Sequence, residues 1–542
     1  MTMEYEQWKE ILSAIDKETG LSKDNVIEKV KEKLEAKSED EYKEWKKAGF
    51  GVNHLFHTVF KSHFPLSFQN PEYKYTLLHL VAHDNLGNVA DALSKVEEIN
   101  VNAVNGPAGW TPLHIAAEFN SEKVIDVLSE AEKINVSAGS CTQCTPLHIA
   151  ANYDSKKAID ALLKVEGIDV NAINQDNETP LHCAAQFCNE GAISALLKAK
   201  KIDVNAIDKD NKTPLHFVAL ESFDEEALNI LIKGGADVKA VDKNGNTPLH
   251  FVASHCYDKK IAKALIENEA DVNAINQDRC TPLHCAVQGG RTGIVEALIE
   301  KRADVKAVDK DGSTPLHFAA SRYRDEKIVK VLIGKGADVN AEDEDKRTPL
   351  HYAKDEETIK TLIGAGANVK AVDKDGNTPL HFAAWNKWTV GILIANGADP
   401  LLKNKDVKTP KDLAKNDDIK KLLKAAEEKQ LKKLNEEKNN LTQYKNDNKD
   451  TILGKTEPTS ATTKGVFAGG ATVLLGTAVA VALFATGTVA VELMPIMIAV
   501  AAVTIAALVV GLAAYGIAHA ISKPSTKVDE TKVNENERKV LV

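Results

Sequence analysis

Thr314-Pro315-Leu316-His317-Phe318-Ala319-Ala320 is one copy of a stretch that recurs along this chain. Near-copies begin at Thr111, Thr145, Thr179, Thr213, Thr247, Thr281, Thr348 and Thr378, with a weaker one at Thr76 and a divergent one at Thr409. Successive threonines lie 35, 34, 34, 34, 34, 34, 33, 34, 30 and 31 residues apart. A fixed period in this range is typical of a solenoid, in which each repeat packs against its neighbours. The stretch therefore predicts one elongated array over residues 76–426.

The residue types in this stretch explain why a helix should begin there. Thr314 is suited to the N-cap, because its hydroxyl can accept the N–H of the third helical residue. Pro315 then occupies the first helical position, where a backbone donor is not needed. Alanines keep this helix slim, and Gly336 suits the left-handed residue that ends the following helix. That second helix should carry an apolar stripe of Ile328, Val329, Val331, Leu332 and Ile333.

A helix, a loop, a second helix and a β-turn in about 33 residues, opened by Thr-Pro-Leu-His, resemble the ankyrin repeat. The turn is of the Asp-Lys-Asp-Gly type at 309–312 and 373–376. The resemblance implies an all-α solenoid of about eleven L-shaped repeats, whose turns project as fingers. It also implies that the array binds partner proteins on its fingers and concave helix face. The architecture is similar to that of ankyrin proteins of intracellular bacteria, several of which act on host proteins.

The residue just before each threonine varies while the scaffold around it stays the same. We call these positions the pre-threonine residues and predict that they lie at the fingertips. A changing side chain on a fixed scaffold is typical of a modular binding surface, although drift on a solvated turn is the alternative. The candidate partner-binding residues are Trp110, Glu178, Lys212, Asn246, Ser313, Arg347, Asn377 and Lys408, with Cys144 and Cys280 in the same column.

Some repeats depart from the pattern. The step from Thr348 to Thr378 is short, which leaves almost no loop between its two helices and predicts a change of curvature near residues 350–400. Early repeats end in Ile-Asn-Val or Ile-Asp-Val without glycine, so their second helices should be capped differently. Trp385 and Trp388 lie in another shortened segment. They could anchor a partner, but we favour the interpretation that they fill the gap left by the missing loop.

The ten motif histidines are predicted to be structural and to hydrogen-bond between neighbouring turns. A zinc ion needs its ligands within ~2.0–2.3 Å, whereas equivalent residues in stacked repeats should lie ~10 Å apart. Cys141 and Cys144 have the spacing of half a zinc ribbon, but no second pair stands at a matching distance. Cys183 and Cys285 occupy a column held by Ile or Phe elsewhere and are predicted to be small core residues. No metal site is therefore expected, and a metal or redox role for Cys141 and Cys144 is the minor alternative.

Residues 1–75 are predicted to form an N-terminal helical cap. Apolar residues at helical spacing indicate two or three amphipathic helices, and the first repeat of a solenoid needs a cover for its apolar face. An independent domain is the alternative. The first residues have neither the basic nor the apolar region of a secretory signal peptide.

The C-terminal part changes composition abruptly. A charged helix and polar linker (427–464) precede two long uncharged runs within 465–522, which are separated by Glu492 and Pro495, and a polar tail follows (523–542). Each run exceeds the ~20 residues needed to cross a bilayer. Both outer flanks are rich in lysine, which predicts a two-span membrane protein with both termini and the array in the cytoplasm. A buried helical pair is the alternative, and Glu492 fits the turn better than an intramembrane site.

The composition limits the classes of function. A net charge of −10 argues against binding to nucleic acid, which calls for a basic face. No phosphate-binding glycine loop, nucleophile elbow or HExxH motif is present, so no catalytic residue, cofactor or small-molecule substrate is predicted, and an enzyme within 1–75 is improbable. The leading hypothesis is a membrane-anchored scaffold whose cytoplasmic array binds proteins. The alternative is a channel or pore-forming component that the array docks or gates.

Overall fold

The computed structural model describes residues 3–59, 74–221, 224–321, 326–384 and 386–447. The chain divides into two compact units at Leu434, and of the second unit only the end of helix α25 is described. Most of the predicted polar linker, the two uncharged runs within 465–522 and the tail 523–542 lie outside the described residues. Among the helices that are described, none is long and apolar enough to span a bilayer.

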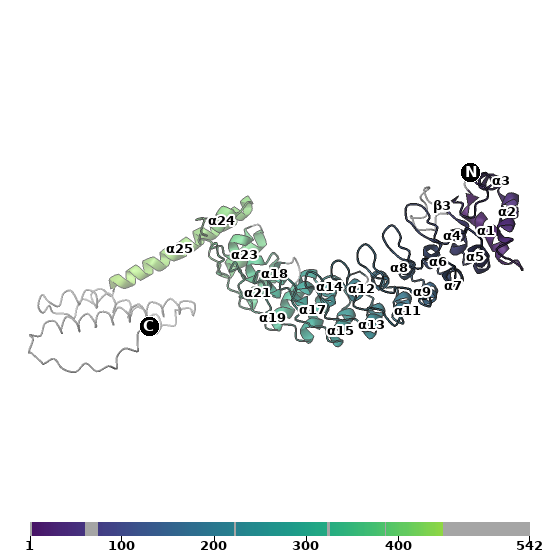
Figure 1. Cartoon of the computed structure of the whole chain (residues 1–542). Coiled ribbons are helices and arrows are strands. Elements are labelled where there is room, and N and C mark those ends of the chain that lie inside the picture. Colours follow the sequence, from purple (N-terminus) through teal and green to yellow (C-terminus); the bar gives the residue numbers. More distant parts are fainter. Residues whose placement is uncertain (1–2, 60–73, 222–223, 322–325, 385, 448–542) are drawn as a thin grey trace, which may run out of the picture. The chain divides into compact units, whose positions relative to one another are not determined.

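The array consists of helix pairs that follow one another in a single row (Figure 1). First helices pack on first helices of the adjacent repeat, and second helices pack on second helices. The first helices are α4 (Leu77–His83), α6 (Pro112–Glu118), α8 (Pro146–Asn152), α10 (Pro180–Gln186), α12 (Pro214–Glu221), α14 (Pro248–His255), α16 (Pro282–Gly289), α18 (Pro315–Ser321), α20 (Pro349–Tyr352), α22 (Pro379–Ala383) and α24 (Pro410–Leu413). The second helices are α5 (Gly87–Ser94), α7 (Glu122–Ser129), α9 (Lys156–Leu162), α11 (Glu190–Leu196), α13 (Glu225–Lys233), α15 (Lys259–Glu267), α17 (Thr292–Glu300), α19 (Glu326–Gly334), α21 (Glu356–Gly364), α23 (Lys387–Ala395) and α25 (Asp417–Asp447).

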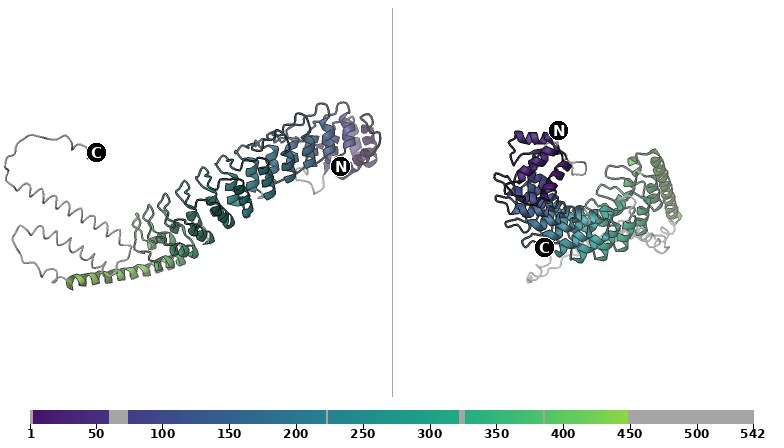
Figure 2. Two further views of the ribbon diagram at one scale, coloured as in Figure 1. Left: turned by 90° about the horizontal axis from the view of Figure 1, so that it is seen from below. Right: turned by 90° about the vertical axis from the view of Figure 1, so that its right-hand side faces the viewer.

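The core is a continuous strip between the two layers of helices. The motif leucine and the alanines after it are buried in the first helix, as Leu316 and Ala320 illustrate, and the stripe residues Ile328 and Leu332 meet them from α19. Burying one such aliphatic side chain stabilises the fold by about 1.5–3 kcal/mol. The loops between repeats project from one side of the helix layers, as the two further views show (Figure 2). The predicted helical solenoid is confirmed.

The ends of the second helices do not divide into an early and a late pattern. Gly336 has a φ of 88°, in the left-handed region that glycine adopts without strain, and Gly167 in an early repeat has a φ of 82°. Other residues adopt the same conformation both early, at Glu98 and Lys133, and late, at Glu269 and Arg302. The short repeats differ from the prediction, because they lose part of the first helix as well as the loop. Helix α20 has 4 residues where α18 has 7.

The N-terminal region has three short strands besides its predicted helices, whereas the array is all-helical as predicted. Helices α1 (Tyr5–Asp16), α2 (Val26–Lys37) and α3 (Glu39–Lys47) are flanked by strands β1 (Met3–Glu4), β2 (Phe56–Val59) and β3 (Lys74–Tyr75), which pair in the order β1-β2-β3. Strand β1 is parallel to β2 and β3 is antiparallel to it, with Phe56 opposite Tyr75. The chain must return from α3 to the first repeat, and strand pairing satisfies its backbone while Phe56 and Tyr75 are buried.

The N-terminal region contacts the first repeat as one repeat contacts the next. In the array, Asn85 Oδ1 accepts the backbone N–H of Lys123 (2.9 Å) at the start of the next repeat's second helix. Asp16 does the same for α5, because its Oδ1 accepts the N–H groups of Asn88 (2.9 Å) and Val89 (3.0 Å). The N-terminal region thus provides a side chain that caps the start of helix α5 in the array.

Replacing Asp16 with alanine should therefore loosen the first repeat. The loss of an N-capping side chain destabilises a helix by about 1 kcal/mol. We expect the urea midpoint to fall by a corresponding amount, with hydrogen exchange accelerated in α5 and unchanged in the central repeats. Asp24→Ala, at an exposed position of the same region, is the control. Equal effects of the two substitutions would contradict the capping role.

Candidate binding surface

Each motif histidine joins one repeat to the next. The backbone N–H of Thr314 donates to Nδ1 of His317 (3.0 Å), so Nδ1 carries no proton and Nε2 is the donor. Nε2 of His317 donates to the carbonyl of Arg347 in the next repeat (3.0 Å). The same pair of bonds occurs at His79, His114, His148, His182, His216, His250, His284, His351 and His381. The predicted hydrogen bonding between neighbouring turns is confirmed.

These rings are held neutral. Burial lowers the pKa of His79, His114, His148 and His216 to about 4, although the bond to a backbone carbonyl raises it in part. Both ring nitrogens are engaged by backbone groups and by the threonine hydroxyl, as at Thr314 Oγ1 and His317 Nδ1 (2.9 Å). The rings therefore have no lone pair left for a metal ion, which supports the structural role.

Most of the fingers are built around an Asp or Asn five residues before the threonine, which is buried or half-buried, and Ser140 takes this place before Thr145. Oδ1 of Asp309 accepts the N–H groups of Asp311 (2.9 Å) and Ser313 (2.7 Å), and its own N–H donates to the carbonyl of Ser313 (3.0 Å). Residues 310–312 consequently form the exposed end of the finger. Adjacent fingers are also bonded, since the Lys310 N–H donates to the carbonyl of Asp278 (2.8 Å). The fingers thus form one hydrogen-bonded ribbon.

The pre-threonine residues lie at the base of the fingers, which corrects their predicted position at the tips. The pairing of Asp309 with Ser313 places the pre-threonine residue beside the buried Asp, and its carbonyl receives the histidine of the preceding repeat. Trp110, Glu178, Lys212, Asn246, Ser313, Arg347 and Asn377 are all half-buried, and only Lys408 of the eight candidates is exposed. Their role in partner binding stays a prediction.

The half-buried side chains mostly contact their own scaffold. Asn174 Nδ2 donates to Glu178 Oε2 (2.8 Å), and the indole of Trp110 stacks near His114 with ring centroids 6.2 Å apart. Other pairs are Lys212 with the ring of Phe217 and Asn246 with Asn276. These contacts hold the bases of the fingers in place.

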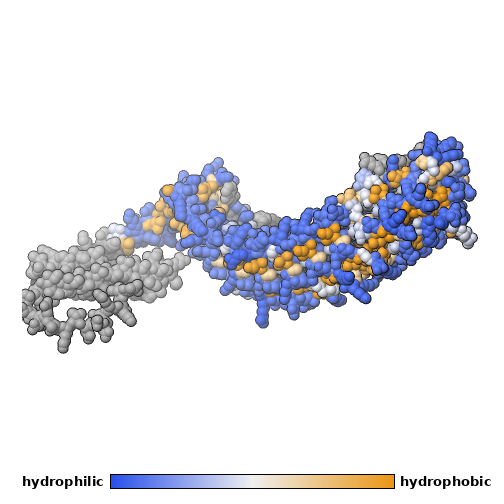
Figure 3. Space-filling view, in the orientation of Figure 1, coloured by the Kyte–Doolittle hydropathy of each residue, from blue (hydrophilic) through white to orange (hydrophobic). Residues whose placement is uncertain are grey.

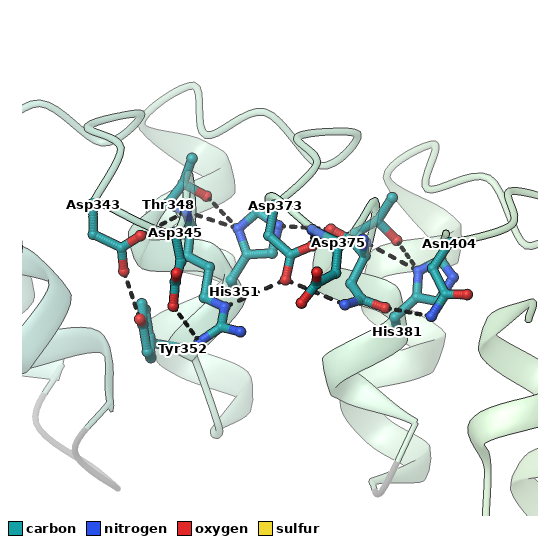
Figure 4. A network of polar contacts seen from close by, with 12 residues as sticks. Asp343, Asp345, Thr348, His351, Tyr352, Asp373, Asp375, His381 and Asn404 are labelled. Atoms are coloured by element: carbon teal, nitrogen blue, oxygen red, sulfur yellow. Dashed lines mark hydrogen bonds and ion pairs between the residues drawn. The ribbon is translucent and has the colours of Figure 1, made fainter. Parts of the chain in front are cut away.

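Arg347 and Asn377 meet at Asp373 (Figure 4). Arg347 Nε donates to Asp373 Oδ2 at 3.3 Å, and Asn377 Nδ2 donates to the same oxygen at 3.2 Å. Burial alone would raise the pKa of Asp373, but the bonds from Asn377 and Arg347 hold it below its ordinary value. In the same network the Tyr352 hydroxyl donates to Asp343 Oδ2 (2.5 Å). Two predicted candidate residues thus stabilise one buried carboxylate.

Arg347→Ala should destabilise the array by about 1–2 kcal/mol at pH 7, because Asp373 would lose a charged partner. The Asp373 carboxyl has a depressed pKa in the folded state, so this stability is present above its unfolded pKa and is lost as the pH falls through the folded value. The difference in urea midpoint should consequently shrink below about pH 4. Lys374→Ala, at an exposed neighbouring position, is the control. A difference that persists unchanged at pH 3 would contradict this account.

Exposed apolar side chains form a feature that the sequence predictions missed. Six residues before the threonine, several successive repeats carry an exposed Val or Ile, and apolar residues gather on the visible face of the array (Figure 3). The recurrence of Val or Ile six residues before the threonine, in most repeats from Ile173 to Val372, was visible in the sequence.

Trp388 is 72% exposed, so the interpretation that it fills a gap is wrong; Trp385 lies outside the described residues. Tyr257 is 83% exposed and its ring lies 3.6 Å from the Arg291 guanidinium.

The cysteines are all free thiols. Cys141 is exposed and Cys144 is half-buried beside the Thr142 hydroxyl (3.4 Å). Cys183 is buried, and burial raises the pKa of its thiol. Cys285 is half-buried and packs against the core, and burial raises the pKa of its thiol to about 12. Within the described residues no group of His, Cys, Asp or Glu is arranged to hold a metal ion.

Comparison with known proteins agrees with this geometry. A family model described as "Ankyrin repeats (3 copies)" matches residues 48–138, 131–208, 196–276, 215–309, 251–343 and 316–404. The crystal structure of the ankyrin repeat domain of Bcl-3, a member of the IκB protein family, shares 28% identity over 41% of this chain and 99% of that chain, with a TM-score of 0.37. No curated protein sequence matches. Because the family model covers well over half of the sequence, this chain belongs to the ankyrin-repeat family.

Proposed function

We propose that this chain is a membrane-anchored scaffold whose ankyrin array binds partner proteins. The observation that carries the proposal is the contrast within each finger. Histidine and aspartate bonds fix the backbone in the same way in successive repeats, whereas exposed side chains at one position of the turn differ between neighbouring fingers, as Gln277, Lys310 and Glu344 do. A rigid backbone lowers the entropy lost on binding, so a varied surface on such a frame suits protein recognition.

Membrane anchoring is part of the same proposal and is supported by the sequence. The two uncharged runs of 465–522 are each long enough to cross a bilayer, and lysines flank both outer ends. On the positive-inside rule the array and both termini lie in the cytoplasm. The resemblance to ankyrin proteins of intracellular bacteria makes a host protein a suitable class of partner.

Partner binding is tested by photo-crosslinking capture with the full-length chain in a non-ionic detergent. Ile207→Gln with Val241→Gln alters two exposed side chains of the fingers without touching the core. Tyr257→Gln alters an exposed side chain in the loop between α14 and α15 and serves as the matched control. A partner that the finger variant alone loses supports the proposal. If the wild-type chain captures no partner, or both variants capture it equally, binding through the fingers is wrong.

Anchoring is tested separately by extraction of cell membranes. The full-length chain should stay with the membrane in alkaline carbonate and be released by detergent, and deletion of 465–522 should make it extractable. Protease added to the cytoplasmic side should digest the array. Release of the intact chain by carbonate would contradict the anchor, and protection of the array would contradict its orientation.

A further inference from the structure

A row of exposed aliphatic side chains runs along the fingers. It comprises Ile173, Ile207, Val241, Ile275 and Val308, is interrupted by Glu342 and resumes at Val372. Ile275 is 60% exposed and Val308 is 39% exposed. Single exposed aliphatic residues are normal on a protein surface, but here they recur at one position of successive fingers and therefore lie in line along the array. A partner that lies along the fingers could cover several of them at once.

Two hollows lie on this row, each between adjacent fingers. The first has a volume of about 440 Å³ and is lined by Ile275, Val308, Arg279 and Lys306, with Asp304 as its carboxylate. The second has a volume of about 640 Å³ and is lined by Val372 together with Lys346, Lys370, Lys374 and Lys405, with Glu342 and Asp373 as its carboxylates. Arg279 and Lys346 occupy the same place in their repeats, as do Lys306 and Lys370. The two hollows are thus equivalent sites with an aliphatic side chain and a cationic rim on which cations outnumber carboxylates, and Glu342 stands in the second where Ile275 lines the first.

The turn position of each hollow carries a cation. Arg279 and Lys346 both have a φ of 58° at a position that Gly245, Gly312 and Gly376 occupy in other fingers. Gln143, Asn177, Asn211 and Val407 adopt the same left-handed conformation there, so the position accepts several residue types. Among the described fingers, Arg279 and Lys346 are the cations at this position.

Lysines occupy a second position of each hollow. In other repeats an asparagine at their position joins the repeat to its neighbour, as Asn340 does by accepting the N–H of Asn368 (2.7 Å) and donating to the carbonyl of Gly366 (3.1 Å). Lys306 and Lys370 replace that asparagine, as Lys239 does outside the hollows, and a lysine cannot accept a hydrogen bond. Among the described repeats, a cation at the turn position and a lysine at the asparagine position come together at these two hollows.

We propose that the two hollows bind an extended, acidic segment of a partner protein, with an aliphatic side chain against each Val or Ile and a carboxylate at each cationic rim. The proposal rests on the proposed function and names the chemistry of its partner. The hollows are two repeats apart, or about 16–20 Å. An extended chain covers that distance in about 5–6 residues. A free anion would leave the aliphatic side chains exposed, so a peptide fits the site better.

The test uses substitutions that this chain already carries in other repeats. Arg279→Gly with Lys306→Asn, and Lys346→Gly with Lys370→Asn, remove the cations and introduce residues that other repeats carry at these positions. Lys239→Asn removes an equivalent exposed lysine outside the two hollows and is the control. The probe is a fluorescein-labelled, proline-containing peptide with two Glu-Ile pairs six residues apart, titrated into the full-length chain in non-ionic detergent and followed by anisotropy. A peptide with Lys in place of Glu tests the sign of the charge.

Each double variant should weaken peptide binding at least tenfold without lowering the melting temperature, and the Lys239→Asn chain should bind as the wild type does. The Lys peptide should not bind. If the Glu-Ile peptide does not bind, or if the variants bind it as tightly as the wild type, the proposal is wrong. The proposed function would still stand in that case if the crosslinking capture remained sensitive to Ile207→Gln with Val241→Gln.

Discussion

Acidification from pH 7 to pH 4 should destabilise the array steeply. Burial lowers the pKa of His79, His114, His148 and His216 to about 4, below the ordinary value of about 6.5. A depressed folded-state pKa means that the stability is present above the unfolded pKa and is lost as the pH falls towards the folded one. Each of these rings therefore removes about 1.4 kcal/mol per pH unit between 6.5 and 4.

Several coupled rings make this the largest effect that we expect. Burial also lowers the pKa of the remaining motif histidines, so the losses accumulate along the array. The melting temperature, followed by circular dichroism, should decline steeply as the pH falls from 6 to 4. His255 is exposed, so His255→Ala should leave this profile unchanged. An array that keeps its melting temperature down to pH 4 would contradict neutral, buried rings.

Glu118→Gln should stabilise the array near neutral pH. Glu118 is 7% exposed, and its carboxylate has no close hydrogen bond within the described residues, with the Tyr153 hydroxyl as a weak neighbour. Burial raises the pKa of Glu118 to about 8, an effect that the nearby Tyr153 hydroxyl offsets only in part. Other repeats carry Gln186 and Gln288 at this position, so the amide is compatible with the scaffold.

The pH dependence follows from the direction of that shift. A raised pKa means that the folded state tolerates the protonated carboxyl, so stability is fully present below the unfolded value and is lost as the pH rises through the folded one. The gain from glutamine should therefore be close to zero at pH 4.5 and reach about 2–3 kcal/mol at pH 8. Urea unfolding at both values measures it, with the exposed Glu130→Gln as control. A gain of equal size at the two pH values would exclude deprotonation as its cause.

The repeat could be predicted because its constraints are local. Thr and Pro at a helix start act within one turn, and the spacing of the threonines states the period directly. The bonds of His317 were also accessible, because a histidine that recurs at each helix start needs a partner at the same spacing. The N-terminal strands were not, since β2 and β3 pair across 60–73 and each is too short to carry a sequence pattern.

The candidate surface was harder to predict, because the sequence alone does not show which residues of a finger lie at its exposed end and which lie at its base. The variable pre-threonine residues drew attention by their chemistry, but the pairing of Asp309 with Ser313 places them at the base. Gly312 marked the true end of the turn, since a left-handed residue belongs there. The recurring Val and Ile residues were visible in the sequence, but their pattern was equally consistent with buried core positions. Only the folded finger, in which successive side chains point to opposite sides, shows that these residues are exposed.

The histidine bond has a consequence for how this chain can evolve. Nε2 of each ring seeks a backbone carbonyl in the following repeat, and every residue type supplies one. A junction between two repeats therefore demands no particular side chain from its neighbour. Loss or gain of one whole unit would bring together two ends that already fit. The number of repeats can thus change by unequal recombination without a compensating mutation. Selection can therefore act on the number of fingers as well as on the side chains at their surface.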